Sequence, residues 1–336
     1  MNTLVAHTKT SHHAKPLRLV ETKQIERDKW LAVRQSGIGG SDAAAAIGLN
    51  PYKSPLALWM EKTGRGEMLP QIDIEDDTQP VYWGTILEPI VAKHYSKRTG
   101  NKVRRVNAVL QHPTIPFMLA NLDREIVGNT DVQILECKTA GMNGAKLWKN
   151  GIPDYVQVQV MHQLAVTGKQ AADVAVLICG QDLQIHRIER DETMIENLIK
   201  LERQFWYYVE NDIAPPADGS ISAEQALRCL FPNDDGEVVD LTADADLNHV
   251  FDDLQETRQL LKSIHADEAK MQQRLIQAMG TAAHARFRNG SISYKRSKDS
   301  MVLDSKRMAA ENPDLALQYQ ILKAGNRRFL LSNKTA

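Results

Sequence analysis

The chain has 336 residues, 43% hydrophobic and 25% charged, which is typical of a globular protein long enough for one large or two ordinary domains. Its formal net charge of −1 gives no bulk attraction for nucleic acid, so any polyanion site must be a local patch. Its three cysteines, Cys137, Cys179 and Cys229, form no C-x-x-C pair, which disfavours a disulfide scaffold, a zinc ribbon and an iron–sulfur cluster. No apolar run approaches the ~20 residues of a membrane span, and no apolar leader opens the chain, so we expect a cytoplasmic protein.

The first segments predict a loose tail over residues 1–20 and a helix over 21–33. The glycines of 34–42 end that helix, and Ser41 or Asp42 is expected to cap the alanine-rich helix that follows. A helix start preceded by glycines is suited to an anion, and Arg34 would add a forked phosphate contact. Taken alone, however, these residues are better explained by an ordinary cap and a surface arginine.

A helix is predicted from Trp83 to about Arg98, with Glu88 placed among apolar neighbours. Such a glutamate lies either at the edge of a helix surface or in a site, and the first is the commoner case. The helix end and the next segment are basic from Lys93 to Arg105, which suits contact with phosphates but equally suits a solvated face.

The centre of the chain alternates strands and helices. Strands are predicted over 103–110, 117–127, 132–139, 172–179 and 183–188, and helices over 154–166 and 192–209. This order favours an α/β (α+β) fold in which helices cover both faces of a central mixed sheet.

The predicted strand 132–139 carries two charged side chains, Glu136 and Lys138. Because side chains alternate along a strand, Glu136 and Lys138 point the same way, while Leu135 and Cys137 point into a core. The turn Gly-Asn-Thr-Asp at 128–131 would fold the preceding strand back, so that Asp123 approaches Glu136. Two carboxylates with a lysine beside them form a cation site, because burying such charges is costly unless they are paired or bind a metal.

The predicted helix 154–166 carries Gln157 and Gln159. Side chains two positions apart cannot share one helix face, so only one of the two can point toward the site.

Beyond Pro216 the composition changes, and we expect a main domain over 21–216 and an extension over 217–336. Residues 245–280 show the apolar stripe of one long helix or a helical hairpin. Residues 281–336 hold eleven Lys or Arg against four acids and a hairpin signal at Asn289-Gly290. This basic region could bind DNA, or its charge could balance that of the acidic stretch 234–256.

Five blocks in this order resemble the YqaJ-type viral recombinase family, which looks like the lambda-exonuclease branch of the PD-(D/E)xK nucleases. The resemblance spans about Trp30 to Asp212, and the blocks are Arg34 with 38–42, 83–89, Asp123, 136–138 and 155–159.

The resemblance implies a role for each matching residue. Asp123, Glu136 and the backbone carbonyl of Cys137 would hold the metal, and Lys138 would position or polarise the attacking water. Glu88 and Gln157 would be an auxiliary acid and the glutamine of the later helix. The interval from Asp123 to Glu136 is longer than in the compact motif, and it contains Asp131. A DNA terminal 5′-phosphate would be held by Arg34 and Ser41.

The family resemblance further implies a Mg²⁺-dependent 5′-to-3′ exonuclease, with Mn²⁺ as an alternative ion. It would act on duplex DNA ends in a bacterial or phage-infected cell. Its single-stranded product would feed homologous recombination with an annealing protein, and the enzyme would form a ring trimer. Two alternatives are an endonuclease of restriction or repair type and a non-catalytic DNA-binding member of the fold. Intact Asp123, Glu136 and Lys138 argue against the second.

Overall fold

The computed structural model describes residues 15–23, 25–323 and 325–332. The chain divides into two compact units, Met1–Pro232 and Asn233–Ala336. The first unit ends later than the expected 216, because helix α7 (Ile221–Leu230) packs on α3 (Pro55–Lys62). A hydrogen bond of 2.9 Å from the backbone N–H of Ser54 to Oγ of Ser222 ties these two helices together.

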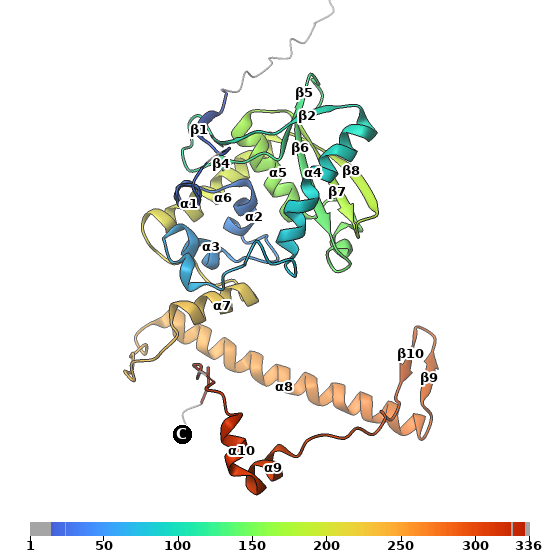
Figure 1. The fold of residues 1–336 in the computed structure, drawn as a ribbon. Coiled ribbons are helices and arrows are strands. Elements are labelled where there is room, and N and C mark those ends of the chain that lie inside the picture. The colour runs from blue at the N-terminus through green and yellow to red at the C-terminus, as the bar shows by residue number, and fades with distance from the viewer. Residues whose placement is uncertain (1–14, 24, 324, 333–336) are drawn as a thin grey trace, which may run out of the picture. The chain divides into compact units, whose positions relative to one another are not determined.

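A five-stranded mixed sheet forms the centre of the first unit (Figure 1). β6 and β7 are parallel and the other neighbours are antiparallel, which confirms the predicted mixed α/β fold. The strand order is β2 (Lys102–Arg104), β5 (Arg124–Val127), β6 (Ile134–Ala140), β7 (Ala171–Ile178) and β8 (Asp182–Glu189).

Helices cover both faces of this sheet and form two separate cores. One core joins Leu135 and Cys137 of β6 to α4 (Pro80–Thr99). The other joins Ile134 and Ala140 of the same strand to α2 (Gly40–Ala46), α3, α5 (Asp154–Thr167) and α6 (Glu192–Glu210). Because residues alternate along a strand, Glu136 and Lys138 lie on the same face as Ile134, toward α5.

A second sheet lies where part of the tail was expected. β1 (Leu17–Glu21) pairs with β3 (Ala108–Gln111), which pairs with β4 (Leu119–Ala120). The prediction of a loose tail is therefore wrong for residues 17–20, because they supply an edge strand; residues 1–14 lie outside the described part of the chain.

The two sheets also explain why two predicted strands are split. The strand expected over 103–110 is divided into β2 and β3, and the one over 117–127 into β4 and β5. In each case the two halves lie in different sheets: β3 and β4 belong to the three-stranded sheet, and β2 and β5 to the five-stranded one. The chain between β4 and β5 carries Asp123.

The remaining elements of the first unit are short. The helix expected over 21–33 begins six residues later, as α1 (Arg27–Gln35). The 3₁₀ turns are Gly66–Met68 and Gly144–Trp148.

The second unit is built on α8 (Ala245–Met279), a single continuous helix of 35 residues rather than a helical hairpin. A hairpin of β9 (His284–Phe287) and β10 (Gly290–Ser293) follows, as predicted, but its two loop residues are Arg288 and Asn289, because Gly290 already pairs with Phe287. Two short helices, α9 (Ser305–Glu311) and α10 (Pro313–Gln318), complete the unit. Within the described residues, the helices lack the combination of length and apolar character that crossing a membrane needs.

Candidate active site

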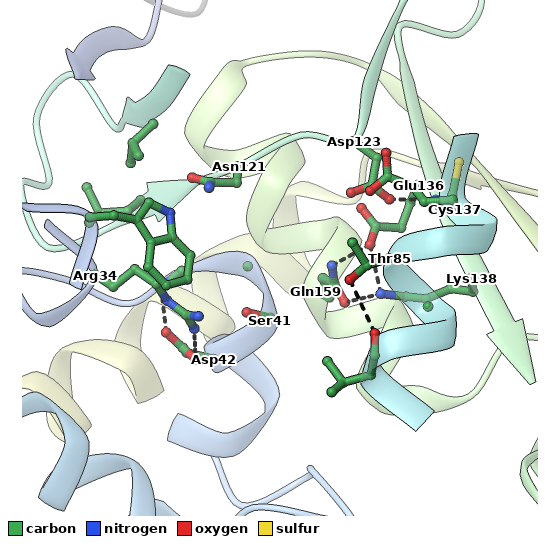
Figure 2. Close-up of a pocket in the computed structure, with 18 of the residues that line it drawn as sticks. Arg34, Ser41, Asp42, Thr85, Asn121, Asp123, Glu136, Cys137, Lys138 and Gln159 are labelled. Carbon is green, nitrogen blue, oxygen red and sulfur yellow. Dashed lines mark hydrogen bonds and ion pairs between the residues drawn. The ribbon is translucent and has the colours of Figure 1, made fainter. Parts of the chain in front are cut away.

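A cleft of about 470 Å³ opens on the face of the sheet that carries Glu136 (Figure 2). Its wall combines the α1–α2 segment, one side of α4, the chain before β5, the middle of β6 and one glutamine of α5. The predicted site residues that line it are Arg34, Ser41, Glu88, Asp123, Glu136, Cys137 and Lys138.

The turn before β6 places Asp123 beside the strand. Gly128 takes a φ of 74°, and Oδ1 of Asn129 accepts a hydrogen bond of 2.8 Å from the backbone N–H of Asp131. β5 then returns antiparallel to β6, and Oδ2 of Asp123 accepts a hydrogen bond of 2.8 Å from the backbone N–H of Cys137. The structure therefore brings Asp123 and Glu136 together.

Three side chains hold the nearly buried carboxylate of Glu136. Oε1 accepts from Nζ of Lys138 at 2.7 Å and from Nε2 of Gln159 at 2.6 Å, and Oε2 accepts from Nε2 of Gln163 at 2.9 Å. A carboxylate offers about four lone-pair directions. These three donors fix its orientation and leave capacity for a further ligand.

The charge of Lys138 is secured by its neighbours. Its Nζ donates to Oε1 of Gln159 at 2.8 Å as well as to Glu136. Burial by itself lowers the pKa of the ammonium, but the negative charges of Glu136 and Asp123 outweigh burial and raise that pKa. Lys138 is therefore protonated at neutral pH.

The surroundings of Asp123 disfavour its charged form, whereas those of Lys138 favour the charged ammonium. Burial, and then the nearby charge of Glu136, raise the pKa of Asp123 to about 8. Two carboxylates that repel each other in a confined place are stabilised by a cation between them. The donors available for such a cation are the two carboxylates and the backbone carbonyl of Cys137.

These donors are all oxygens, the ligands that Mg²⁺ prefers, and Mg²⁺ commonly retains several waters when few protein groups bind it. Among the described residues, no group of three or more His, Cys, Asp or Glu side chains is placed to hold a metal. The oxygen donors by themselves fit a hard, partly hydrated cation.

The side chain of Cys137 belongs to the core, as predicted. It packs with Leu135 and the α4 residues, and burial raises the pKa of its thiol. A thiol that stays protonated is a poor metal ligand and a poor nucleophile.

Glu88 lines the cleft from α4, but its charge is paired. The guanidinium of Arg124 donates both to Oε1 of Glu88 and to the backbone carbonyl of Asp123. Arg124 is almost fully buried and was not singled out from the sequence. Its only signal was its position next to Asp123.

Arg34 and Ser41 lie at the other end of the cleft, around a buried carboxylate. Asp42 accepts from Arg34 at 3.2 Å and from Lys62 at 2.7 Å. Burial by itself raises the pKa of Asp42, but these two cations hold it at about 2. One carboxylate opposed by two cations leaves one positive charge, and Arg34, partly exposed and stacked over the ring of Trp30 at 5.0 Å, presents it to the cleft.

The cap expected at Ser41 or Asp42 is in fact at Gly39. α2 begins at Gly40, and Oδ2 of Asp42 accepts from the backbone N–H of Gly39 at 3.3 Å. Asp42 thus stabilises the helix start from its third position, and Ser41 remains exposed beside the cleft.

Gln157 does not lie in the cleft. Its Nε2 donates to the backbone carbonyl of Ile152 at 2.8 Å, and it lines a second, shallower pocket. Gln159 occupies the place expected for Gln157, because two positions along a helix rotate a side chain by about 200°. Gln163 shares the face of Gln159, and their i,i+4 spacing was the signal that would have found both.

Comparison with known proteins agrees with the resemblance in the sequence. Residues 29–170 match the model of the YqaJ-like viral recombinase domain. The uncharacterized protein YqaJ of Bacillus subtilis (strain 168) is 42% identical over 231 residues, covering 67% of this chain and 70% of that protein.

Two solved structures are similar to part of this chain. An alkaline exonuclease from Laribacter hongkongensis is 23% identical, with a TM-score of 0.45 over 55% of this chain and 94% of that one. A phage-related exonuclease from Haemophilus somnus 129PT is 11% identical, with a TM-score of 0.38 over 53% and 95%. These likenesses are partial, and the assignment rests on the domain match and the bacillar relative: the chain belongs to the family of YqaJ-like viral recombinases.

Proposed function

We propose that this protein is a Mg²⁺-dependent nuclease that degrades duplex DNA from its ends in the 5′-to-3′ direction. The observation that carries the proposal is that one cleft contains both Asp123, Glu136 and Lys138 and, at its other end, Arg34 and Ser41. The first group suits phosphodiester hydrolysis, and the second suits the capture of a terminal phosphate.

Hydrolysis of a phosphodiester requires an activated water and relief of negative charge on the phosphate oxygens. A divalent cation held by Asp123, Glu136 and the carbonyl of Cys137 would supply Lewis-acid stabilisation and a more acidic bound water. Mn²⁺ has the same ligand preference and serves as an alternative ion.

The side chains around this centre have separate tasks. The ammonium of Lys138 adds positive charge next to the scissile phosphate and orients the attacking water. Gln159 holds both Lys138 and Glu136, so it fixes the distance between the acid and the amine. Gln163 holds the second oxygen of Glu136 from within the core. A site fixed before the substrate arrives loses little free energy to reorganisation.

Direction comes from the other end of the cleft. The single positive charge left on the Arg34, Lys62 and Asp42 group favours an anion, and the hydroxyl of Ser41 offers a donor beside it. A terminal 5′-phosphate bound there would place an adjoining linkage toward Lys138. The product strand would be a substrate for a single-strand annealing protein. Trimer formation around DNA would keep the enzyme bound to the duplex between successive cleavages.

The test is incubation of purified protein with Mg²⁺ and four duplexes of equal sequence: linear with 5′-phosphate, linear with 5′-hydroxyl, nicked circular and closed circular. We expect rapid loss of the 5′-phosphorylated linear duplex, slower loss of the 5′-hydroxyl form and an intact closed circle. Glu136→Ala should abolish hydrolysis, and Arg34→Ala should reduce the preference for 5′-phosphate.

Cleavage of closed circles would instead make the protein an endonuclease of the same fold. Binding of DNA without hydrolysis under any divalent cation would leave a DNA-binding role. Full activity of Glu136→Ala would refute the assignment of the centre itself.

A further inference from the structure

The long helix α8 carries an exposed apolar stripe with the spacing of a coiled coil. Apolar side chains recur at intervals of three, four or seven residues, which fits the heptad pattern in which two positions per repeat face a partner helix. The stripe consists of Leu247, Val250, Leu254, Leu261, Ile264, Met271 and Leu275.

Among the described residues, five members of this stripe are exposed, and Leu254 and Leu275 are half-buried. Val250 is 54% exposed and Met271 62% exposed, although both belong to a regular helix of 35 residues. Phe329 contacts the helix at Arg258, which lies beside the stripe. A helix with such a face gains most of its stability by burying it against another element.

We propose that the stripe of α8 pairs antiparallel with α8 of a second copy of this chain. Two polar residues interrupt the stripe, Thr257 and Glu268, and they decide the direction. In a parallel pair each residue faces its own equivalent, so two Glu268 carboxylates would meet in the interface, which is costly.

In the antiparallel pair, two residues that face each other lie at equal distances along the helix, on opposite sides of the midpoint between positions 262 and 263. Thr257 then faces Glu268 of the second copy, so its hydroxyl can donate to that carboxylate. The apolar partners match in the same register: Val250 with Leu275, Leu254 with Met271, and Leu261 with Ile264.

The charges beside the stripe fit this register. Asp253 and Arg274 each precede a stripe residue, Leu254 and Leu275, and so hold the same flanking position of the heptad. Such positions approach each other across an antiparallel pair, here two residues away from the register of the stripe itself. More generally, residues 245–257 hold four acids and no Lys or Arg, whereas 258–279 hold four Lys or Arg against two acids. This gradient also suits the dipole of a single helix, so the pairing of Thr257 with Glu268 is the stronger argument for direction.

Cysteine cross-linking tests the register in the full chain. The starting variant replaces Cys179 and Cys229 by Ser and keeps the buried Cys137. Val250→Cys with Leu275→Cys should then form a covalent dimer under mild oxidation, seen on non-reducing gels. The two cysteines cannot close within one helix, because 25 residues of helix span about 38 Å. Val250→Cys alone is the matched control and should stay monomeric on the gel.

Two results would overturn the proposal. Equal cross-linking by Val250→Cys alone would mean a parallel pair. Absence of cross-linking in the double variant, at the level of the starting variant, would mean that something other than a second α8 covers the stripe.

Charge reversal provides an independent measurement in solution. Asp253→Arg would oppose Arg274 of the second copy and should weaken association roughly tenfold in sedimentation equilibrium. Asp253→Arg combined with Arg274→Asp should restore it, while circular dichroism shows equal helicity in all three proteins. Association that is indifferent to both changes would place the contact outside α8 and refute the proposal. Nuclease activity plays no part in these readouts, so they stand apart from the proposed function.

Discussion

The orientation of Glu136 depends on three neighbouring side chains. Its carboxylate is oriented by Lys138 from its own strand and by Gln159 and Gln163 from α5. The oxygen Oε1 of Gln163 is buried without a hydrogen-bond partner among the described residues, which costs free energy.

The two glutamines of α5 give the sharpest residue-level prediction. Gln159→Ala removes a donor from Glu136 and an acceptor from Lys138, so we expect kcat on linear duplex to fall by roughly 10²-fold. Gln157→Ala changes the same residue type two positions away and should leave kcat near the wild-type value. A loss confined to Gln157→Ala would contradict the placement of Gln159.

A buried pair between α5 and α6 makes stability depend on pH. Nδ1 of His162 lies 2.7 Å from Oε1 of Glu202, and Nε2 lies 2.8 Å from the carbonyl oxygen of Leu119. A carbonyl only accepts, so Nε2 carries a proton, and a second proton is shared with Glu202. Burial by itself lowers the pKa of His162, but Glu202 outweighs burial and raises it.

The sign of the effect follows from that raised pKa. The stabilisation is complete below the unfolded pKa of about 6.5 and is lost as pH rises through the folded pKa, because only the folded chain holds the proton in between. Glu202→Ala should lower the free energy of unfolding by about 3 kcal/mol near pH 6 and flatten this pH dependence. Glu202→Gln, which keeps an acceptor, should cost less; equal losses in urea titrations would argue against the pair.

At the scale of elements, one short backbone contact joins the two ends of the cleft. The N–H of Ile38 donates to the carbonyl of Phe117 at 2.6 Å, and the N–H of Leu119 donates to the carbonyl of Ile38 at 2.9 Å. This bridge fixes the segment with Arg34 and Ser41 to the chain that leads into Asp123.

The bridge requires a residue without a side chain at position 37, and substitution of Gly37 tests this requirement. A Cβ at Gly37 would lie 2.5 Å from the carbonyl oxygen of Phe117, whereas one at Gly141 would meet nothing within 4 Å. We expect Gly37→Ala to lower the free energy of unfolding by about 1–3 kcal/mol and to reduce the preference for 5′-phosphate. Gly141→Ala is the control in thermal denaturation, and similar Tm values for the two variants would contradict the bridge.

At the scale of the whole molecule, the boundary between units can be located by truncation. A chain that ends at Pro232 keeps α7, whose Ala223 and Ala226 are buried in the first unit, and a chain that ends at Pro216 loses it. We expect the shorter chain to be less stable by roughly 2–4 kcal/mol, since the surface of α3 that α7 covers would be exposed. Equal Tm values would move the boundary back to 216.

The sequence by itself was sufficient for whatever depends on neighbours along the chain. Strand alternation put Glu136 and Lys138 on one face and Cys137 in the core, and the turn at 128–131 brought Asp123 to them. The order of the predicted strands and helices indicated the mixed α/β fold, and the five blocks indicated the family to which the chain belongs.

Only the tertiary structure decided what depends on contacts between distant segments. The choice of Gln159 over Gln157 follows from how α5 is rotated against the sheet, and Arg124 pairs with Glu88 across 36 positions. β1 forms because β3 offers an open edge, which local composition does not reveal. Local periodicity determines which way a side chain points relative to its own backbone, but packing determines what that side chain meets.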